Sequence, residues 1–353
     1  MTNDKMKKTA ILTAVFAFFS ITFMLVSFDN SSVVAADGVS DTREYNGREY
    51  DENEISLDIS ALDAADESTD SMAKEICIPL DKGMSIKSVS LENHYIDRKL
   101  RIYIDDISQG YTDSLKVSCT DNTAALASYV QRTDGDGICV TITTDEVYEY
   151  ESKVADGKLL ISVMNPHDVY DKIVVVDAAG GGNEAGNTSA DGFTEKAVTL
   201  NIVNSLYQMM SSLDIKIYYS RMDDTSVSDE ERTSLIDSIK PDMVIGICAD
   251  GKGVSTYYND SFYIRNFGNV ELADRLERDT AYETGADALG LFSSDGKYQI
   301  LENSKVPSAV LCVGDASNAD DESNLSDSSY IKKIAKGIKN AIEYSYSEME
   351  EKK

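Results

Sequence analysis

Histidine is almost missing from this sequence, which has two, His94 and His167, in 353 residues. Each stands alone, without a constellation of partners, so a Ser-His-Asp triad and other chemistry built on several imidazoles are excluded. Cysteine is also sparse, and no C-x-x-C pair occurs, which excludes a zinc ribbon and a small disulfide scaffold. The five cysteines are Cys77, Cys119, Cys139, Cys248 and Cys312.

Positive charge is the second shortage. The chain has 33 Lys and Arg against 62 Asp and Glu, a formal net charge of −29. Such a chain does not capture nucleic acid or an anionic lipid surface by electrostatics, whereas a basic partner or an uncharged polymer fits. Hydrophobic residues make up 42% and suffice for a core. At about 100 to 200 residues per domain, the length allows two domains and some non-globular segments.

The first 28 residues predict an N-terminal hydrophobic helix. Three lysines precede the uncharged run Thr9–Phe28, which has the length of a bilayer crossing and a basic flank that stays cytoplasmic. The run is read as a transmembrane anchor, or as a signal peptide cleaved after Val34-Ala35-Ala36. Both alternatives place the rest of the chain outside the cell, either anchored in the membrane or secreted to the cell wall.

The next two segments differ in composition. Residues 29–71 are acidic and poor in large apolar side chains, which predicts a disordered linker. Residues 72–170 contain short apolar or alternating runs separated by turn clusters such as Asp134-Gly135-Asp136-Gly137, which predicts a small all-β domain. Its three cysteines are expected to be small core residues, although an extracellular location leaves one disulfide open.

Residues 171–353 predict an α/β domain with a mostly parallel, twisted sheet flanked by helices, because apolar strands alternate with helical patterns. The glycines after the first strand, Gly180-Gly181-Gly182 with Gly186, match neither G-x-G-x-x-G nor a phosphate loop, so nucleotide binding is not expected. Strands are expected at 172–177, 215–219, 243–248 and 309–313, and helices near 194–213, 228–239, 271–280 and 330–346.

The order of motifs from about residue 171 to residue 346 resembles the zinc-dependent N-acetylmuramoyl-L-alanine amidases of bacterial cell walls. Members of that family carry D-A-G-H-G-G, E-K, R-x-x-D, S-I-H-A-N and P-x-x-L-x-E-x-G-F-x-S-N, in this order. The corresponding segments here are Asp177-Ala178-Ala179-Gly180-Gly181-Gly182, Glu195-Lys196, Arg221-Met222-Asp223-Asp224, Gly246-Ile247-Cys248-Ala249-Asp250 and Pro307 to Asn318. The β domain in front is similar in position to the wall-binding domains of such enzymes.

The resemblance implies a zinc site and shows where this chain departs from it. Family members hold zinc with two histidines and one glutamate, and a second glutamate acts as the base that activates the attacking water. The glutamate ligand corresponds to Glu195. The histidine positions hold Gly180, which has no donor, and Cys248, while the base position holds Cys312. No cofactor is therefore expected, except zinc if the site has been rebuilt around Glu195 and the two cysteines.

Three alternatives remain for Cys248 and Cys312, which the resemblance places side by side at strand ends. They are zinc-binding thiolates, a disulfide that closes the pocket, or small buried thiols that fill space. Arg221 and Asp223 are candidate peptide-binding residues, and the alternative is a structural ion pair of Arg221 with Asp223 or Asp224.

These observations favour a cell-wall protein that resembles an amidase but lacks its hydrolytic activity. Its expected partners are peptidoglycan or the stem peptide, or a catalytic amidase that it regulates. The alternative is an active metal-dependent amidase that cleaves the bond between muramic acid and L-alanine with a rebuilt Glu/Cys/Cys site.

Overall fold

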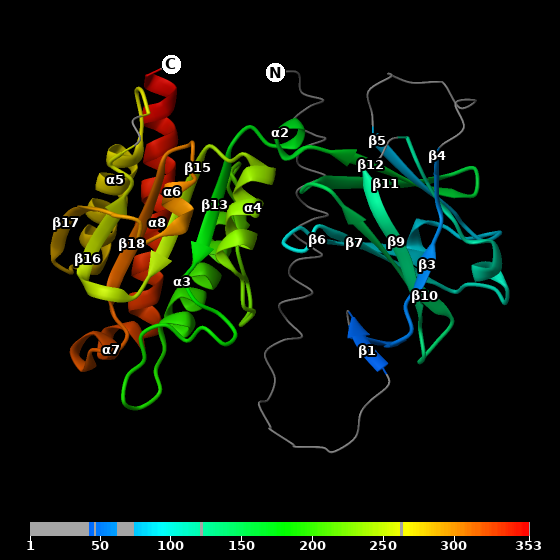
Figure 1. Cartoon of the computed structure of the whole chain (residues 1–353), viewed down its shortest axis with the longest axis horizontal. Helices are drawn as coiled ribbons and strands as arrows, with labels where there is room; N and C mark the ends of the chain where they lie inside the picture. Colours follow the sequence, from blue (N-terminus) through cyan, green and yellow to red (C-terminus); the bar gives the residue numbers. More distant parts are fainter. Residues whose placement is uncertain (1–41, 46, 62–73, 121–122, 262–263, 353) are drawn as a thin grey trace.

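The computed structural model describes residues 42–45, 47–61, 74–120, 123–261 and 264–352. A β part and an α/β part lie side by side in this range (Figure 1). The predicted hydrophobic helix, with the run Thr9–Phe28, lies outside the described residues. No helix within them is both long and apolar enough to cross a bilayer.

The β part is built from two five-stranded sheets that enclose one hydrophobic core. Ile76 and Ile161 from one sheet and Ile102 and Val140 from the other are fully buried in that core. Strand order in the first sheet is β3 (Ile55–Leu57), β9 (Ala124–Gln131), β10 (Gly137–Thr144), β7 (Lys99–Asp105) and β6 (Val89–His94). In the second it is β11 (Glu149–Ala155), β12 (Lys158–Met164), β5 (Lys74–Pro79), β8 (Val117–Cys119) and β4 (Ile59–Ala61).

The prediction of a disordered linker over residues 29–71 is wrong for residues 42–61. β1 (Thr42–Tyr45) and β2 (Arg48–Asp51) form an antiparallel hairpin, and β3 and β4 each add a strand to one of the two sheets. The reason is local: the Tyr50 ring is fully buried against Tyr103, and Arg48 forms an ion pair of 2.9 Å with Asp105. A few well-placed apolar and aromatic side chains outweigh the acidic composition here.

Cys77, Cys119 and Cys139 are buried, as expected of small core residues. In the antiparallel pair β5/β8, Cys119 lies opposite Ile76 and Cys77 lies opposite Ser118. Directly opposed residues share a face of the sheet, so Cys77 and Cys119 point to opposite faces.

The α/β part is organised around one six-stranded sheet whose pairs are parallel except β16/β18. The prediction of a mostly parallel sheet is confirmed. The strand order is β14 (Lys216–Tyr219), β13 (Ile173–Ala178), β15 (Met243–Cys248), β18 (Ser308–Asp315), β16 (Asp250–Tyr258) and β17 (Ala288–Ser293).

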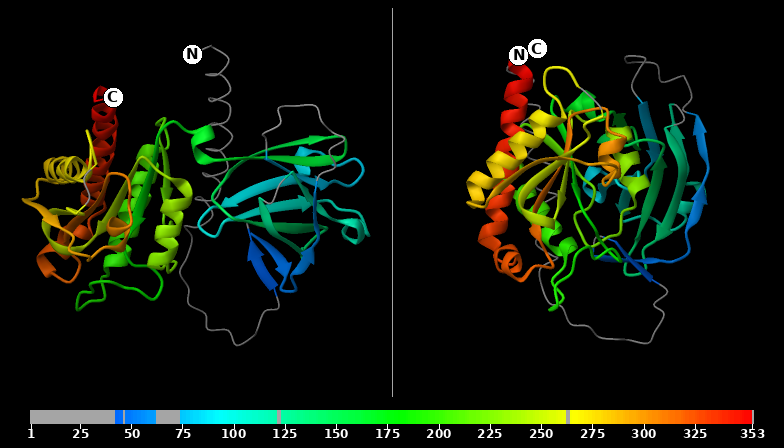
Figure 2. Two further views of the ribbon diagram at one scale, coloured as in Figure 1. Left: turned by 45° about the horizontal axis from the view of Figure 1, so that its top comes forward. Right: turned by 60° about the vertical axis from the view of Figure 1, so that its left-hand side comes forward.

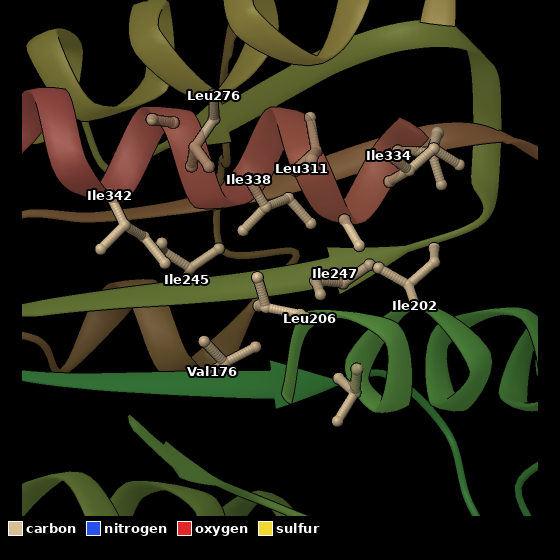
Figure 3. Packing of buried hydrophobic residues seen from close by; sticks show 14 of the residues in the cluster. Val176, Ile202, Leu206, Ile245, Ile247, Leu276, Leu311, Ile334, Ile338 and Ile342 are labelled. Carbon is tan, nitrogen blue, oxygen red and sulfur yellow. The ribbon is translucent and has the colours of Figure 1, made fainter. Parts of the chain in front are cut away.

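Helices cover both faces of this sheet (Figure 2). On one face, Ile202, Leu276 and Ile338 from three helices pack against strand residues such as Ile247 and Leu311 (Figure 3). Those helices are α3 (Glu195–Met210), α5 (Asn269–Thr284) and α8 (Ser328–Glu351). The opposite face is covered by α4 (Asp229–Ile239) and the short α6 (Gln299–Glu302). The remaining short elements are η2 (Ile86–Ser88), η3 (Tyr111–Ser114), α2 (Pro166–Val169) and α7 (Ala319–Leu325).

Two local features explain how these helices begin and pack. Ser228 and Glu231 form a capping box at the start of α4: the Ser228 hydroxyl accepts from the Glu231 amide, and the Glu231 carboxylate accepts from the Ser228 amide. Gly337 lets α8 approach α5 closely, because a Cβ at this position would lie 2.5 Å from the Cα of Thr280.

A buried ionic cluster joins the two parts of the molecule. Glu149 of the β part is 3% exposed, forms an ion pair of 3.0 Å with Lys216, and accepts a hydrogen bond of 2.6 Å from the Tyr218 hydroxyl. The Tyr95 hydroxyl donates to the carbonyl of Tyr219 at 2.9 Å. Burial alone would lower the pKa of Lys216, but the charge of Glu149 outweighs it and raises that pKa.

Candidate functional site

The carboxyl ends of three neighbouring parallel strands, β13, β15 and β18, meet at one edge of the sheet, where α/β proteins commonly place their sites. β15 ends at Cys248, and Cys312 of β18 lies directly opposite in the register. Ile247 and Leu311 point to the face covered by α3, α5 and α8, so the two cysteines point together to the opposite face.

Cys248 and Cys312 form a disulfide. Their Cα atoms are 4.6 Å apart, within the range of about 4.4 to 6.8 Å that a disulfide requires. Both side chains are buried, with exposed fractions of 1% and 0%. Of the three alternatives that the sequence left for this pair, the structure has the disulfide.

Three polar residues that the sequence analysis missed surround this disulfide. The Tyr298 hydroxyl lies 3.5 Å from the Cys248 Sγ, 3.4 Å from the Cys312 Sγ and 3.3 Å from the Asp250 Oδ1. Asp250 Oδ1 also lies 3.3 Å from the Cys312 Sγ, and its other oxygen pairs with Lys297 at 2.7 Å. Asp250 could have been suspected because it follows the end of β15, whereas no pattern marks Lys297 or Tyr298.

Electrostatics in this group follow from burial and from the Asp250 charge. Burial alone would lower the pKa of Lys297, but hydrogen bonding and charge from Asp250 outweigh it and raise that pKa. Burial raises the pKa of Tyr298, so its hydroxyl stays protonated and can donate to the Asp250 carboxylate. The group is therefore an ion pair and a phenol packed over a disulfide.

Glu195 lies next to this group, at the first residue of α3, but its carboxylate is engaged elsewhere. One oxygen accepts from the Ala249 amide at 2.9 Å, and the other accepts from the Asn187 amide at 3.1 Å. Burial raises the pKa of Glu195, while these two amides favour the charged form. The side chain thus ties the loop that precedes α3 to the end of β15.

The turn after β13 is shaped for glycine. Gly180 has a φ of +72°, and a Cβ there would lie 2.7 Å from the Glu184 carbonyl oxygen and 3.0 Å from the Lys196 Cβ. A Cβ at Gly186 would overlap the Glu195 carboxylate. A histidine at residue 180 would therefore need this turn to be rebuilt.

Two buried arginines stabilise the same turn by hydrogen bonds to its backbone carbonyls. Arg221 is 1% exposed and donates to the carbonyls of Ala178, Ala179, Lys196 and Asp223 and to the Thr199 hydroxyl. Arg232 pairs with Asp177 and donates to the carbonyls of Ala178 and Gly180. Burial lowers the pKa of Arg232 to about 10.

These contacts bear on the predicted roles of Arg221 and Asp223. Arg221 contacts the backbone carbonyl of Asp223, whereas the Asp223 carboxylate accepts from Thr225. Instead of an ion pair with Asp223, Arg221 thus makes a hydrogen bond to the Asp223 backbone. Asp224 pairs with Lys196 at 2.7 Å. The peptide-binding role of Arg221 and Asp223 stays a prediction.

The residues at the expected zinc positions do not fit a zinc ion in this state. Gly180 offers no donor atom, the two sulfurs are joined to each other, and both Glu195 oxygens are used by backbone amides. A catalytic zinc site needs three protein ligands with an open fourth position. The structure brings Cys248 and Cys312 together as the resemblance implies, with Glu195 beside them, but it does not assemble three ligands from the predicted set.

In a comparison with known protein families, residues 174–344 match the family described as N-acetylmuramoyl-L-alanine amidase. N-acetylmuramoyl-L-alanine amidase LytC of Bacillus subtilis (strain 168) is 25% identical over 187 residues, 51% of this chain and 36% of that protein. Probable cell wall amidase LytH of Staphylococcus aureus is 28% identical over 182 residues, 50% of this chain and 59% of that protein. The chain therefore spans less than two thirds of the length of either relative.

Solved structures also match about half of the chain. The N-acetylmuramoyl-L-alanine amidase from Clostridium difficile 630 has a TM-score of 0.46 at 24% identity, covering 52% of this chain and 98% of that chain. The CwlD amidase from Clostridioides difficile in complex with the GerS lipoprotein has a TM-score of 0.46 at 22% identity, covering 50% of this chain and 99% of that chain.

Proposed function

Because residues 174–344 belong to the N-acetylmuramoyl-L-alanine amidase family, we propose that this chain is a cell-wall protein that binds peptidoglycan without hydrolysing it. The observation that carries the proposal is the Cys248–Cys312 disulfide. It occupies two positions where the resemblance implies a zinc ligand and the catalytic base. A disulfide supplies neither a thiolate to a metal nor a carboxylate to a water molecule.

The chemistry that zinc supplies in this family is the activation of a water molecule for attack on an amide. Loss of the positioned base alone typically lowers the rate by about 10² to 10⁴. Here the first histidine position is also a glycine, in a turn that leaves no room for a larger side chain. Absence of both a ligand and the base supports a chain without hydrolytic turnover.

Binding does not require the missing groups. The glycine turn, the two buried arginines and Glu195 maintain the strand-end edge of the fold through backbone contacts. We propose that this edge holds a stem peptide, with Arg221 and Asp223 beneath it. The β domain of residues 72–170 is proposed to contact the wall as well.

The proposed location is outside the cell, with the segment of residues 1–28 as a membrane anchor or a signal peptide. A disulfide is a common feature of extracellular proteins and is rare in the reducing cytosol, which supports this location.

The decisive test incubates the purified chain with peptidoglycan and measures two quantities. The first is release of stem peptides, and the second is the fraction of protein that sediments with the insoluble wall. We expect sedimentation without release. Release that a chelator abolishes, and that Glu195→Gln also removes, would contradict the proposal and favour an active amidase.

The second candidate role is regulation of a catalytic amidase, and the same assay separates the two. Protein that stays in the supernatant, but alters the rate of an added amidase of this family, would replace wall binding by partner binding. If the strand-end edge holds the stem peptide, Asp223→Asn should lower the fraction of protein that sediments. Asp113→Asn, which lies on the β part and changes the charge by the same amount, is the control and should not.

A further inference from the structure

We propose that the Cys248–Cys312 disulfide is reversible and that its reduction creates a metal site in which Asp250, not Glu195, is the third ligand. Among the described residues, Cys248, Asp250 and Cys312 form the group of metal-ligating side chains whose donor atoms lie within 4.8 Å of one another. This site differs from the expected Glu/Cys/Cys set, and it does not depend on peptidoglycan binding.

Backbone geometry explains why Asp250 belongs to the group. β16 runs antiparallel to β18, with a register shift between Asp250 and Val254 that brings the chain back over the end of β18. As a result, a Cβ at Gly251 would lie 3.5 Å from the Cys312 Cβ, and the Asp250 carboxylate reaches the Cys312 sulfur. The same feature leaves Glu195 on the other side of Ala249, bound to its amide.

The donor set fits a soft, four-coordinate ion. Thiolates favour Zn²⁺ or Cu⁺ over Mg²⁺ and Ca²⁺, and a carboxylate completes a third position for zinc. With zinc–sulfur bonds of about 2.3 Å in a tetrahedral site, the two sulfurs need a separation of about 3.8 Å. Once the disulfide is open, Cys248 and Cys312 need only small side-chain rotations to reach that separation, because their Cα atoms are neighbours in the register.

Tyr298 occupies the place where a fourth ligand would lie. Its hydroxyl is within 3.3 to 3.5 Å of both sulfurs and of the Asp250 oxygen, which makes it the common neighbour of all three donors. Lys297, which pairs with Asp250 in the oxidised state, has a side chain that is 44% exposed and can turn outward when a cation replaces it.

Reduction of the Cys248–Cys312 disulfide needs an electron donor, and an external dithiol is the proposed reductant. One thiolate of the dithiol attacks a sulfur of the Cys248–Cys312 bond and forms a mixed disulfide, and its second thiol then displaces the protein sulfur. The dithiol is oxidised to a disulfide, and this chain gains two electrons and two protons as two thiols. Metal binding then releases the thiol protons to solvent.

The experiment uses the whole chain, reduced with dithiothreitol under anaerobic conditions and freed of reductant by gel filtration. After the reductant has been removed, alkylation in denaturant followed by mass spectrometry counts the thiols, including those that are buried in the folded chain. We expect reduction of the folded chain to add two thiols, at Cys248 and Cys312. A thiol count that is the same with and without reduction of the folded protein would overturn the reversible disulfide.

Metal binding is then measured directly. Zinc content comes from elemental mass spectrometry, and cobalt substitution gives a thiolate-to-cobalt charge-transfer band. We expect one ion per reduced chain and none per oxidised chain. Asp250→Asn, which keeps both cysteines, should weaken zinc affinity by about 10- to 100-fold or more.

Two further variants decide which carboxylate is the ligand. Asp315→Asn, a matched change at the end of β18, should keep wild-type zinc affinity. Loss of zinc in Glu195→Gln with retention in Asp250→Asn would overturn the proposed ligand set. Absence of zinc and cobalt from the reduced wild-type chain would overturn the site itself, whatever the result with peptidoglycan.

Discussion

Two buried glutamates, at different places in the molecule, have their negative charge compensated in different ways. Glu149, at the contact between the two parts, pairs with Lys216 and accepts from the Tyr218 hydroxyl. Glu195, at the strand-end site, accepts from two backbone amides, and no ion pair of Glu195 occurs among the residues that the structure describes. Both are largely withdrawn from water, at 3% and 6% exposure.

The difference shows two ways in which a buried carboxylate is stabilised. A buried carboxylate needs partners, and these can be a cation or several N–H groups. Glu195 also lies in the first turn of α3, where the helix dipole favours an acid. The presence of Glu195 is therefore explained by the loop that it holds.

The largest effect is expected from removing the cation beside Glu149. Lys216→Met leaves a buried carboxylate without its ion-pair partner, which should lower the free energy of unfolding by about 3 to 5 kcal/mol. Urea denaturation followed by circular dichroism measures it. The control is Lys172→Met, which breaks an exposed pair with Glu350 and should cost less than about 1 kcal/mol. If the two variants lose the same stability, the hydrogen bond from Tyr218 is enough to stabilise the Glu149 carboxylate.

The disulfide beside Glu195 should have the next largest effect. It closes a loop with a sequence separation of 64 residues, so the double variant Cys248→Ala, Cys312→Ala should lose about 2 to 4 kcal/mol. Thermal unfolding with and without reductant checks this on the wild-type chain. Cys139→Ala, which removes one buried sulfur from the β part, is the control and should not remove the response to reductant. If the melting temperature of the wild-type chain is the same with and without reductant, the disulfide does not stabilise the fold as expected.

A histidine at residue 180, where the resemblance implies a zinc ligand, is expected to lower the stability of the fold without creating a zinc site. Gly180→His places a side chain in a left-handed conformation and against the Glu184 carbonyl, at a total of about 2 to 3 kcal/mol. Gly192→His is the matched control, since Gly192 also has a positive φ but nothing within 4 Å of its Cβ position. Its loss should be about 1 to 2 kcal/mol. Similar stabilities of the two variants, with zinc in the first, would show that the turn adapts.

The smallest effect is a pH dependence from Glu195. Since burial raises its pKa above the ordinary 4.5, the folded wild-type chain binds this proton more tightly than the unfolded chain. The stability that this group adds at acidic pH is lost as the pH rises from about 4.5 through the raised pKa. Glu195→Gln lacks this slope.

The comparison is made by urea denaturation of both proteins at several pH values. Near pH 4.5 the variant should be less stable by about 1 to 2 kcal/mol, because one backbone amide faces an NH₂ group in place of an acceptor. The difference in the free energy of unfolding between the wild-type chain and Glu195→Gln should become smaller toward neutral pH. A gap that widens with pH would indicate that the two amides lower the pKa of Glu195 more than burial raises it.

Much of the α/β part could be predicted from the sequence, because its central strands are continuous apolar runs. The predicted strand 243–248 has the same bounds as β15, and 309–313 lies inside β18. β16 and β17 escaped prediction since Gly251 and Gly253 interrupt the first and the second lies at an exposed sheet edge. The hairpin and the two short strands of residues 42–61 were not predicted, because they depend on a few individual contacts and not on a hydrophobic pattern.

At the site, the resemblance gave the neighbourhood of Cys248 and Cys312 but not their oxidation state. Spacing cannot tell a disulfide from two thiols, since it depends on how closely two strands approach. Asp250 and Tyr298 come from a strand start and a loop 48 residues apart, and only the bend in β16 brings them together. No sequence pattern predicts contacts that depend on such a bend.

The cluster of Glu149, Lys216 and Tyr218 has a consequence for how the chain can be dissected. A cut near residue 170, where the composition changes, would leave the acid in one fragment and the base in the other. Each fragment would then expose to water a surface built for the missing half, with Tyr95 and Val147 also losing their partners across the cut. The two parts are therefore separable by composition but share a buried contact, so neither fragment keeps its full set of partners.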